Sequence, residues 1–221
     1  MTTRPRVAIF DVNETVTDLV PLRGAFEEIG LPGHLVDTWY AGLLRDGIAL
    51  TAAGGYADFA DVAAGVLKSL LPGWGGDPDH AVEHVMAAFT QLHVHPDIPE
   101  GMRMLRDQGI RLFTLTVGVA AITEAVLARD GIRDLVEECL DVSGPRAWKP
   151  ARASYAYALG KAGVRPDEAV MIAVHPWDID GAQRAGLHGA WLDRQGTPYP
   201  PAMLAPEITA PDLIALASVW A

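Results

Sequence analysis

The chain has 221 residues, of which 50% are hydrophobic and 20% are charged. This composition suits a globular protein with a substantial core and excludes an intrinsically disordered chain. The 28 acidic residues outnumber the 17 Lys and Arg residues and give a formal net charge of −11, which argues against nucleic acid or an anionic membrane as partner but allows a small anionic substrate in a locally positive pocket.

Short apolar runs typical of buried parallel strands recur along the chain. They lie at residues 7–10, 111–116, 139–142, 169–174 and 189–192. Helical patterns that end near a glycine separate the later runs, at residues 100–108, 120–129 and 153–162. This alternation predicts an α/β fold with a doubly wound, Rossmann-like parallel sheet.

Residues 16–91 have a different character, because they are rich in Ala, Leu and Gly and contain no convincing strand. Helical periodicity covers residues 36–44, 57–71 and 81–91. We therefore expect a catalytic core of residues 1–15 and 92–221 with an inserted helical domain at 16–91. Ligands of open α/β sheets bind outside the carboxyl ends of the strands, so the insertion would cover that edge as a cap. The proline-rich stretch 197–211 is expected to be a loop before a last helix at 213–219.

The cysteine content and the amino-terminal sequence limit the cross-links, the metal sites and the cellular location that we expect for the protein. Cys139 is the only cysteine, which excludes an internal disulfide and a cysteine-based zinc site. The first apolar run stops at Asp11 after four residues, whereas a secretory signal needs roughly 7–15 apolar residues and a membrane span about 20. We expect a cytoplasmic protein with no membrane association. A homodimer is left open.

Polar residues stand at four predicted strand ends or loops, in a fixed order. They are Asp11 with Thr15 four residues later, Thr116, Lys149 before a proline, and Asp178 after a tryptophan. This set resembles the four motifs of the haloacid dehalogenase superfamily, and the helical insertion lies where that superfamily carries its cap. The resemblance extends over essentially the whole chain.

The residue types also make chemical sense as one site. A carboxylate nucleophile such as Asp11 forms a covalent ester and divides one difficult displacement into two easier steps. The ammonium group of Lys149 would keep Asp11 ionised. Asp178 would hold Lys149 in place and help to activate water for the second step. The hydroxyl of Thr116 and nearby backbone N–H groups would bind a substrate anion, and Thr15 is expected to belong to the site.

Two positions distinguish the branches of the superfamily. Phosphatases of this superfamily carry a second aspartate, a general acid, where this chain has Asn13, and a carboxylate ligand for Mg²⁺ where it has Val174. An amide cannot supply an acidic proton, and a valine cannot bind Mg²⁺. A halide leaving group needs neither a general acid nor a metal, so we expect no metal and no cofactor.

The sequence most resembles the type II 2-haloacid dehalogenases. Arg45 lies close to the position of that family's halide-receiving cap arginine, and Tyr155 stands six residues after Lys149, as the family's active-site tyrosine does. The resemblance implies that Asp11 attacks the carbon that bears the halogen, that halide leaves towards Arg45, and that water then releases a 2-hydroxy acid from the Asp11 ester.

The chain departs from this family at two places. Val117 replaces the asparagine after the second motif, and Ala173, Val174 and His175 replace a Ser-Ser-Asn segment before the fourth. We expect Asn13, Val117 and His175 to line the substrate site, and His175 can act as an acid or a base near neutral pH.

These departures leave alternatives open. One is a Mg²⁺-dependent phosphatase of small phosphate esters, and another is a non-catalytic binding or regulatory protein. A third is a hydrolase or a specialised biosynthetic enzyme that uses Asp11 on an unhalogenated substrate. The nearby pair His93 and His95 lacks an evident third ligand, so a metal site there is not expected.

Overall fold

The structure, a computed structural model, describes residues 4–71 and 75–221. The chain divides into two compact units: a sheet unit, formed by the chain up to Thr17 together with His93–Ala221, and a helical unit, Asp18–Leu92. Residues 1–3 and 72–74, which fall in the predicted core and cap respectively, lie outside the described residues. The role of the helical unit as a cap stays a prediction.

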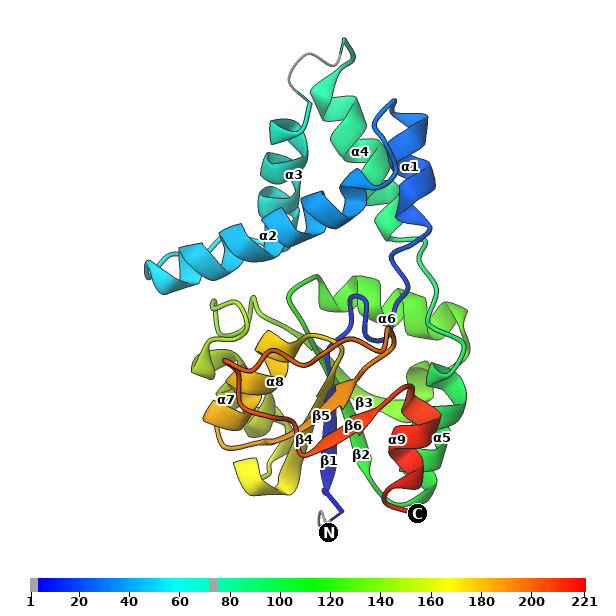
Figure 1. The fold of residues 1–221 in the computed structure, drawn as a ribbon, viewed down its shortest axis with the longest axis vertical. Coiled ribbons are helices and arrows are strands. Elements are labelled where there is room, and N and C mark those ends of the chain that lie inside the picture. Colours follow the sequence, from blue (N-terminus) through cyan, green and yellow to red (C-terminus); the bar gives the residue numbers. More distant parts are fainter. Residues whose placement is uncertain (1–3, 72–74) are drawn as a thin grey trace. The chain divides into compact units, whose positions relative to one another are not determined.

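A parallel sheet forms the centre of the sheet unit (Figure 1). Within the described residues its six strands have the order β3-β2-β1-β4-β5-β6, and every neighbouring pair is parallel. The strands are β1 (Val7–Phe10), β2 (Arg111–Thr116), β3 (Val136–Asp141), β4 (Ala169–Ala173), β5 (His188–Leu192) and β6 (Ile208–Ala210). This order, with β1 in the middle, confirms the doubly wound fold class expected from the sequence.

Helices cover both faces of the sheet (Figure 1). They are α5 (Ile98–Asp107), α6 (Ala120–Arg129), α7 (Arg152–Ala162), α8 (Pro176–Arg184) and α9 (Leu213–Ser218), with short 3-10 turns at Arg133–Leu135 and Pro166–Glu168. The glycine stop predicted after 153–162 is Gly163, which ends α7 with a φ of 66°. Such a left-handed conformation carries little penalty for glycine because it has no Cβ.

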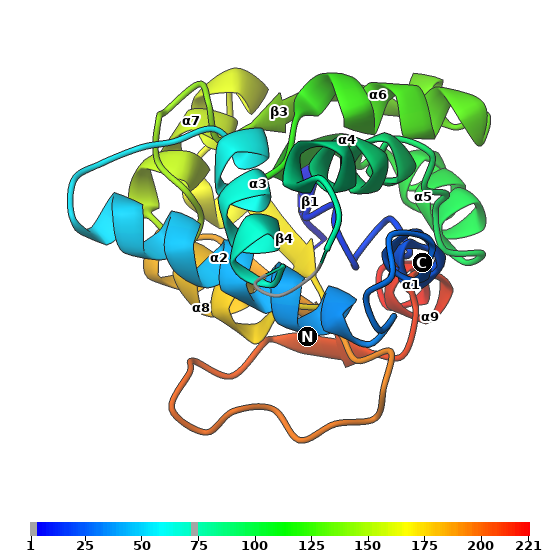
Figure 2. The same cartoon turned by 90° about the horizontal axis from the view of Figure 1, so that it is seen from above.

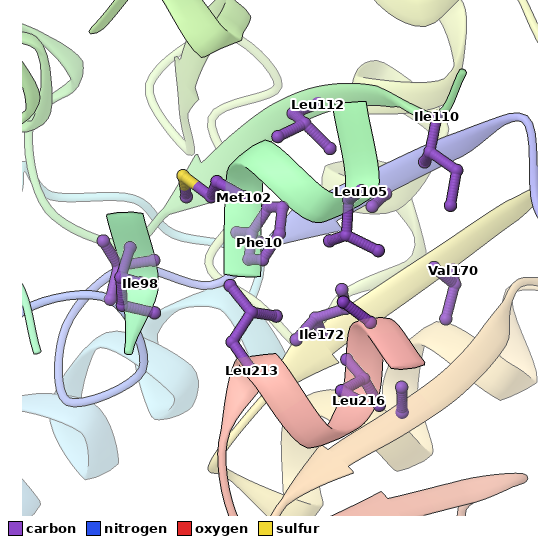
Figure 3. Close-up of a cluster of buried hydrophobic side chains, with 14 of the residues drawn as sticks. Phe10, Ile98, Met102, Leu105, Ile110, Leu112, Val170, Ile172, Leu213 and Leu216 are labelled. Carbon is purple, nitrogen blue, oxygen red and sulfur yellow. The ribbon is translucent and has the colours of Figure 1, made fainter. Parts of the chain in front are cut away.

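Side chains of each strand alternate between the two faces, which creates two cores. On one face, Phe10 and Leu112 pack with residues of α5 and α9, as Figure 3 shows for Met102, Leu105 and Leu213. On the other face, the alternate residues of β1 pack against α7 and α8. Burial on both faces explains why these strands read in the sequence as continuous apolar runs.

Two predictions within the sheet unit were wrong in detail. The predicted loop 197–211 contains the strand β6, which is only three residues long and pairs with β5 alone. The predicted insertion began at residue 16, but Val16 and Thr17 belong to the sheet unit. The Val16 carbonyl accepts a hydrogen bond from the His95 N–H at 2.8 Å, and Thr17 forms an antiparallel bridge with Val94.

The helical unit contains α1 (Leu22–Glu28), α2 (Leu35–Ala52), α3 (Phe59–Ser69) and α4 (Pro78–Phe89). α2 packs against α3, and α1 packs against α4 (Figure 1 and Figure 2). The fully buried Trp39 lies at its centre, with its ring centroid 5.9 Å from that of Phe26 and 6.5 Å from that of Phe89. The sequence did not predict α1 and underestimated the length of α2. No helix among the described residues is long and apolar enough to cross a membrane.

Candidate active site

The site begins where β1 ends. Asp11 follows the last residue of β1, and its N–H donates to the Ile172 carbonyl of β4 at 3.0 Å. The chain then turns sharply, because the N–H groups of Val16 and Thr17 both donate to the Val12 carbonyl, at 2.7 and 2.9 Å. This turn brings the Thr15 hydroxyl back to Asp11, where it donates to Oδ2 at 2.6 Å. The same hydroxyl accepts from the Val174 N–H at 3.0 Å, so Thr15 joins the ends of β1 and β4.

Lys149 connects two carboxylates in the interior. Its ammonium group lies 2.7 Å from Asp11 Oδ1 and 2.6 Å from Asp178 Oδ2, and all three side chains are almost completely buried. The hydroxyl of Tyr155 donates to Asp178 Oδ1 at 2.6 Å. Lys149 therefore fixes the position of Asp11. Asp178 of α8 in turn fixes Lys149, and Tyr155 of α7 fixes Asp178.

The electrostatics of this group favour an ionised Asp11. Burial alone would raise the pKa of Asp11, but the Lys149 ammonium and the hydrogen bond from His175 hold it well below its ordinary value. Burial raises the pKa of Asp178, because Lys149 only partly compensates and the charge of Asp11 adds to the effect. Burial would lower the pKa of Lys149, but the two carboxylates raise it. Asp11 is thus a buried anion, and a carboxylate nucleophile must be ionised.

His175 contacts the Asp11 carboxylate at the oxygen that Lys149 does not bind. Its Nδ1 is 3.0 Å from Asp11 Oδ2, its Nε2 is 2.8 Å from Glu14 Oε2, and its ring lies against that of Trp177 with centroids 5.0 Å apart. Burial would lower the pKa of His175, but the hydrogen bonds to Asp11 and Glu14 raise it to about 9. The ring is therefore an imidazolium at neutral pH, with both nitrogens donating.

The remaining predicted residues of the sheet unit gather after β2. The Thr116 hydroxyl accepts from the Gly118 N–H at 2.9 Å, and a Cβ added to Gly118 would lie 3.1 Å from that hydroxyl and 3.5 Å from Asn13 Nδ2. Asn13 Nδ2 is buried and has no hydrogen-bond partner within the described part of the chain. Val117 is buried beside them and adds only an apolar surface.

Arg45 belongs to the helical unit. It lies in α2 with its side chain 72% exposed, and its Nε donates to Asp46 at 2.7 Å. This pair raises the pKa of Arg45 and lowers that of Asp46. The halide-receiving role of Arg45 stays a prediction.

Sequence reasoning missed three residues that support the site. Glu14 binds His175, and its carbonyl lies 3.0 Å from His95 Nε2. Arg194 donates to the Thr15 carbonyl at 2.9 Å and to Asp97 at 2.9 Å. Glu14 stands between Asp11 and Thr15, so its proximity could have been inferred. No sequence pattern indicates His95 or Arg194, because both reach the loop from distant positions.

The donor set does not fit a divalent metal. The two carboxylates that would bind it, Asp11 and Asp178, each direct an oxygen at Lys149, and an ammonium between them disfavours a second cation. Val174 offers no oxygen from its side chain. Across residues 4–71 and 75–221, no group of three or more His, Cys, Asp or Glu side chains is placed to hold a metal ion.

Comparison with known proteins agrees with this geometry. An (S)-2-haloacid dehalogenase of Burkholderia cepacia is 26% identical over 87% of this chain and 85% of its own length. A phosphoserine phosphatase of Thermus thermophilus is 31% identical over 67% of this chain and 61% of its own length. The fold is similar to that of an L-2-haloacid dehalogenase from Xanthobacter autotrophicus, with a TM-score of 0.88, 22% identity and coverage of 97% of this chain and 98% of the other. The family model of haloacid dehalogenase-like hydrolases matches residues 5–186, and the chain belongs to this family.

Proposed function

We propose that this chain hydrolyses the carbon–halogen bond of short 2-haloacids and releases halide and a 2-hydroxy acid by way of an ester on Asp11. The observation that carries the proposal is the buried Asp11 carboxylate, which Lys149 and His175 keep ionised. The similarity to (S)-2-haloacid dehalogenases supports the substrate class.

In the first step, an oxygen of Asp11 attacks the carbon that bears the halogen. The new C–O bond forms as the carbon–halogen bond breaks, and the halide leaves with the electron pair on the side opposite Asp11. In-line attack inverts the configuration at this carbon. Arg45 would receive the halide, a role that rests on its position in the sequence. In the second step, water attacks the ester carbonyl of Asp11 and restores the carboxylate.

The carboxylate of the haloacid needs hydrogen-bond donors close to Asp11. The turn after β1 and the end of β2 supply them, because the amide Nδ2 of Asn13 has no partner within the described residues and the Thr116 hydroxyl retains its own proton to donate. A buried donor without a partner carries a free-energy penalty that an anionic ligand would relieve. We therefore propose that Asn13 and Thr116 bind the substrate carboxylate.

A phosphatase is the second candidate, since the phosphoserine phosphatase of Thermus thermophilus is among the relatives. Two observations weigh against it. Asn13 cannot protonate an alcohol leaving group, and the Val174 side chain offers no oxygen where the phosphatases have a carboxylate ligand for Mg²⁺. Dehalogenation needs neither an acid nor a metal.

The test is halide release from L-2-chloropropionate and from fluoro-, chloro- and bromoacetate, with and without EDTA. We expect turnover that is insensitive to EDTA. Asp11→Asn should reduce it by about 10³-fold or more, because an amide is not a nucleophile. Asp134→Asn, which changes an exposed carboxylate of the sheet unit, is the matched control and should retain full activity. Absence of halide release from all four substrates would reject the proposal, and hydrolysis of phosphate esters that EDTA abolishes would replace it with the phosphatase.

A further inference from the structure

The departure of halide does not need a proton from His175 or Glu14. A halide leaves without a proton, and it leaves on the side of the carbon opposite the attacking oxygen. His175 Nδ1 is instead 3.0 Å from Asp11 Oδ2, next to the nucleophile itself. A group in this position contacts the ester that forms on Asp11, and ester hydrolysis is the step in which protons move.

We propose that His175, supported by Glu14, is the general base that activates water for hydrolysis of the Asp11 ester, and that it then returns the proton to the departing 2-hydroxy acid. This inference rests on the proposed function, since it concerns the second half of that reaction.

Asp178 is less suited to activate water, although the sequence suggested it. One of its oxygens accepts from Lys149 and the other accepts from Tyr155, both at 2.6 Å, and the side chain is fully buried. These contacts commit the carboxylate to holding Lys149. The side chain of His175, in contrast, is 12% exposed, so a water molecule can reach the ring from solvent.

Glu14 is placed to orient the ring. Its φ of 64° is in the left-handed region, which is unfavourable for residues with a Cβ. His95 Nε2 contacts its carbonyl at 3.0 Å, and the surrounding turn is fixed by hydrogen bonds to the Val12 carbonyl. In this conformation the Glu14 carboxylate lies 2.8 Å from His175 Nε2. A carboxylate there keeps a proton on Nε2 and leaves Nδ1 to face the reacting group.

Ester formation changes the charge state that His175 favours. The charged groups around it are Asp11 and Glu14, with Lys149 on the other oxygen of Asp11 and paired with Asp178. While Asp11 is an anion, the pKa of His175 is about 9 and the ring carries two protons. Alkylation removes the charge of Asp11, so the pKa of His175 falls and Nδ1 loses its proton to solvent. The base is thus generated only after the ester has formed.

The hydrolysis step then balances. Water attacks Cγ of Asp11 as His175 Nδ1 takes one of its protons. The tetrahedral intermediate breaks its bond to the substrate oxygen, and this oxygen takes the proton back from His175 to become the hydroxyl of the product. The carboxylic acid left on Asp11 passes its proton to Nδ1, which restores the starting ion pair. One proton is released per halide, as the overall reaction requires.

The experiment separates the two halves of the reaction. Wild type, His175→Asn and His175→Gln are mixed with L-2-chloropropionate, quenched at intervals, and assayed for halide and for intact protein mass. We expect each His175 variant to release a burst of halide and to accumulate the ester on Asp11, with steady-state turnover reduced by about 100-fold. The burst amplitude counts only the folded, competent enzyme, so partial misfolding does not obscure the result. His188→Asn is the matched control. His188 Nδ1 lies 2.7 Å from a carboxylate oxygen of Glu207 and does not contact Asp11, so this variant should not lengthen the lifetime of the ester.

The role of Glu14 has its own readout. Glu14→Gln removes the carboxylate that raises the pKa of His175, so the rate of ester breakdown should depend on pH with an inflection at lower pH than in wild type.

Ester breakdown at the wild-type rate in His175→Asn would overturn the inference, and so would loss of the halide burst in that variant. Failure of the wild-type enzyme to release halide would instead reject the proposed function.

Discussion

At the scale of single residues, the burial of Lys149 links the candidate site to the stability of the protein. A buried ammonium group is tolerated because two carboxylates pair with it at 2.6–2.7 Å. Removal of one partner from such a buried group typically destabilises a protein by about 3–5 kcal/mol, because the remaining charges lie uncompensated. The contacts that position the Asp11 carboxylate therefore also stabilise the folded core.

The pKa of His175 predicts how stability depends on pH. Its folded-state pKa of about 9 lies above the ordinary value of 6.5, so its contribution to stability is complete below pH 6.5 and is lost as the pH rises through 9. The largest effect that this difference allows is about 3 kcal/mol. We expect the stability advantage of wild type over His175→Asn to shrink between pH 6.5 and 9, measured as the difference in urea unfolding midpoints. An advantage that stays constant over this range would contradict the assignment.

Sequence reasoning identified the residues that the site brings together but not how they are supported. Asp11, Thr15, Lys149 and Asp178 were predicted from their places at strand ends and from the resemblance to the four motifs. The structure joins them in one chain of hydrogen bonds, from Thr15 through Asp11 and Lys149 to Asp178. The contact between Glu14 and His175 depends on a left-handed backbone conformation at a residue other than glycine. Local sequence preference argues against such a conformation. The closeness of Glu14 to Asp11 in the chain could therefore be inferred, but its contact with His175 could not.

At the scale of elements, patterns of burial explain what was predicted and what was not. The strands β1, β2 and β4 were recognised because both of their faces are buried, which gives continuous apolar runs. β6 was missed because it has three residues and alternates between buried and exposed positions. The short helix α1 was missed for a similar reason, since seven residues give little periodicity.

Helix α8 approaches the loop after Lys149 closely at Gly181. A Cβ added there would lie 2.4 Å from Pro150 Cβ and 2.7 Å from the Tyr155 hydroxyl, so one of these groups would have to move. We expect Gly181→Ala to lower the free energy of unfolding by about 1–3 kcal/mol and to lower kcat for halide release, because Pro150 and Tyr155 position the charged site. Urea unfolding and steady-state halide release measure these two effects.

Gly160 in α7 offers the matched control. It is exposed, and an added Cβ would meet nothing within 4 Å. Gly160→Ala should therefore stabilise the protein by about 0.5–1 kcal/mol through helix propensity, with kcat unchanged. A Gly181→Ala variant that behaves like Gly160→Ala would show that α8 tolerates a shift away from the loop.

At the scale of the whole molecule, one pair of short segments joins the helical unit to the sheet unit. Thr17 bridges Val94, and the His95 N–H donates to the Val16 carbonyl at 2.8 Å. The returning segment is also fixed by Asp130, which accepts from the Val94 N–H at 2.8 Å. All of these contacts lie within the sheet unit. The sheet unit therefore holds both ends of the insertion by its own interactions.

This arrangement predicts that the sheet unit folds without the helical unit. Residues of an antiparallel bridge lie about 5 Å apart, so a short Gly-Ser linker can replace residues 18–92 without strain. We expect the shortened protein to be monodisperse and to unfold cooperatively in urea, with the far-ultraviolet circular dichroism of an α/β sheet. Aggregation, or the absence of a cooperative transition, would show that the helical unit is needed for folding.

The bridge between Thr17 and Val94 also bears on how such a protein can accommodate a different insertion. Because the insertion leaves and returns at neighbouring points, its length and sequence can vary without altering the register of the sheet or the placement of Asp11, Lys149 and His175. The bridge thus marks the position at which one insertion can replace another. Helical units exchanged there, by recombination or in the laboratory, would leave the charge and the orientation of Asp11 as they are.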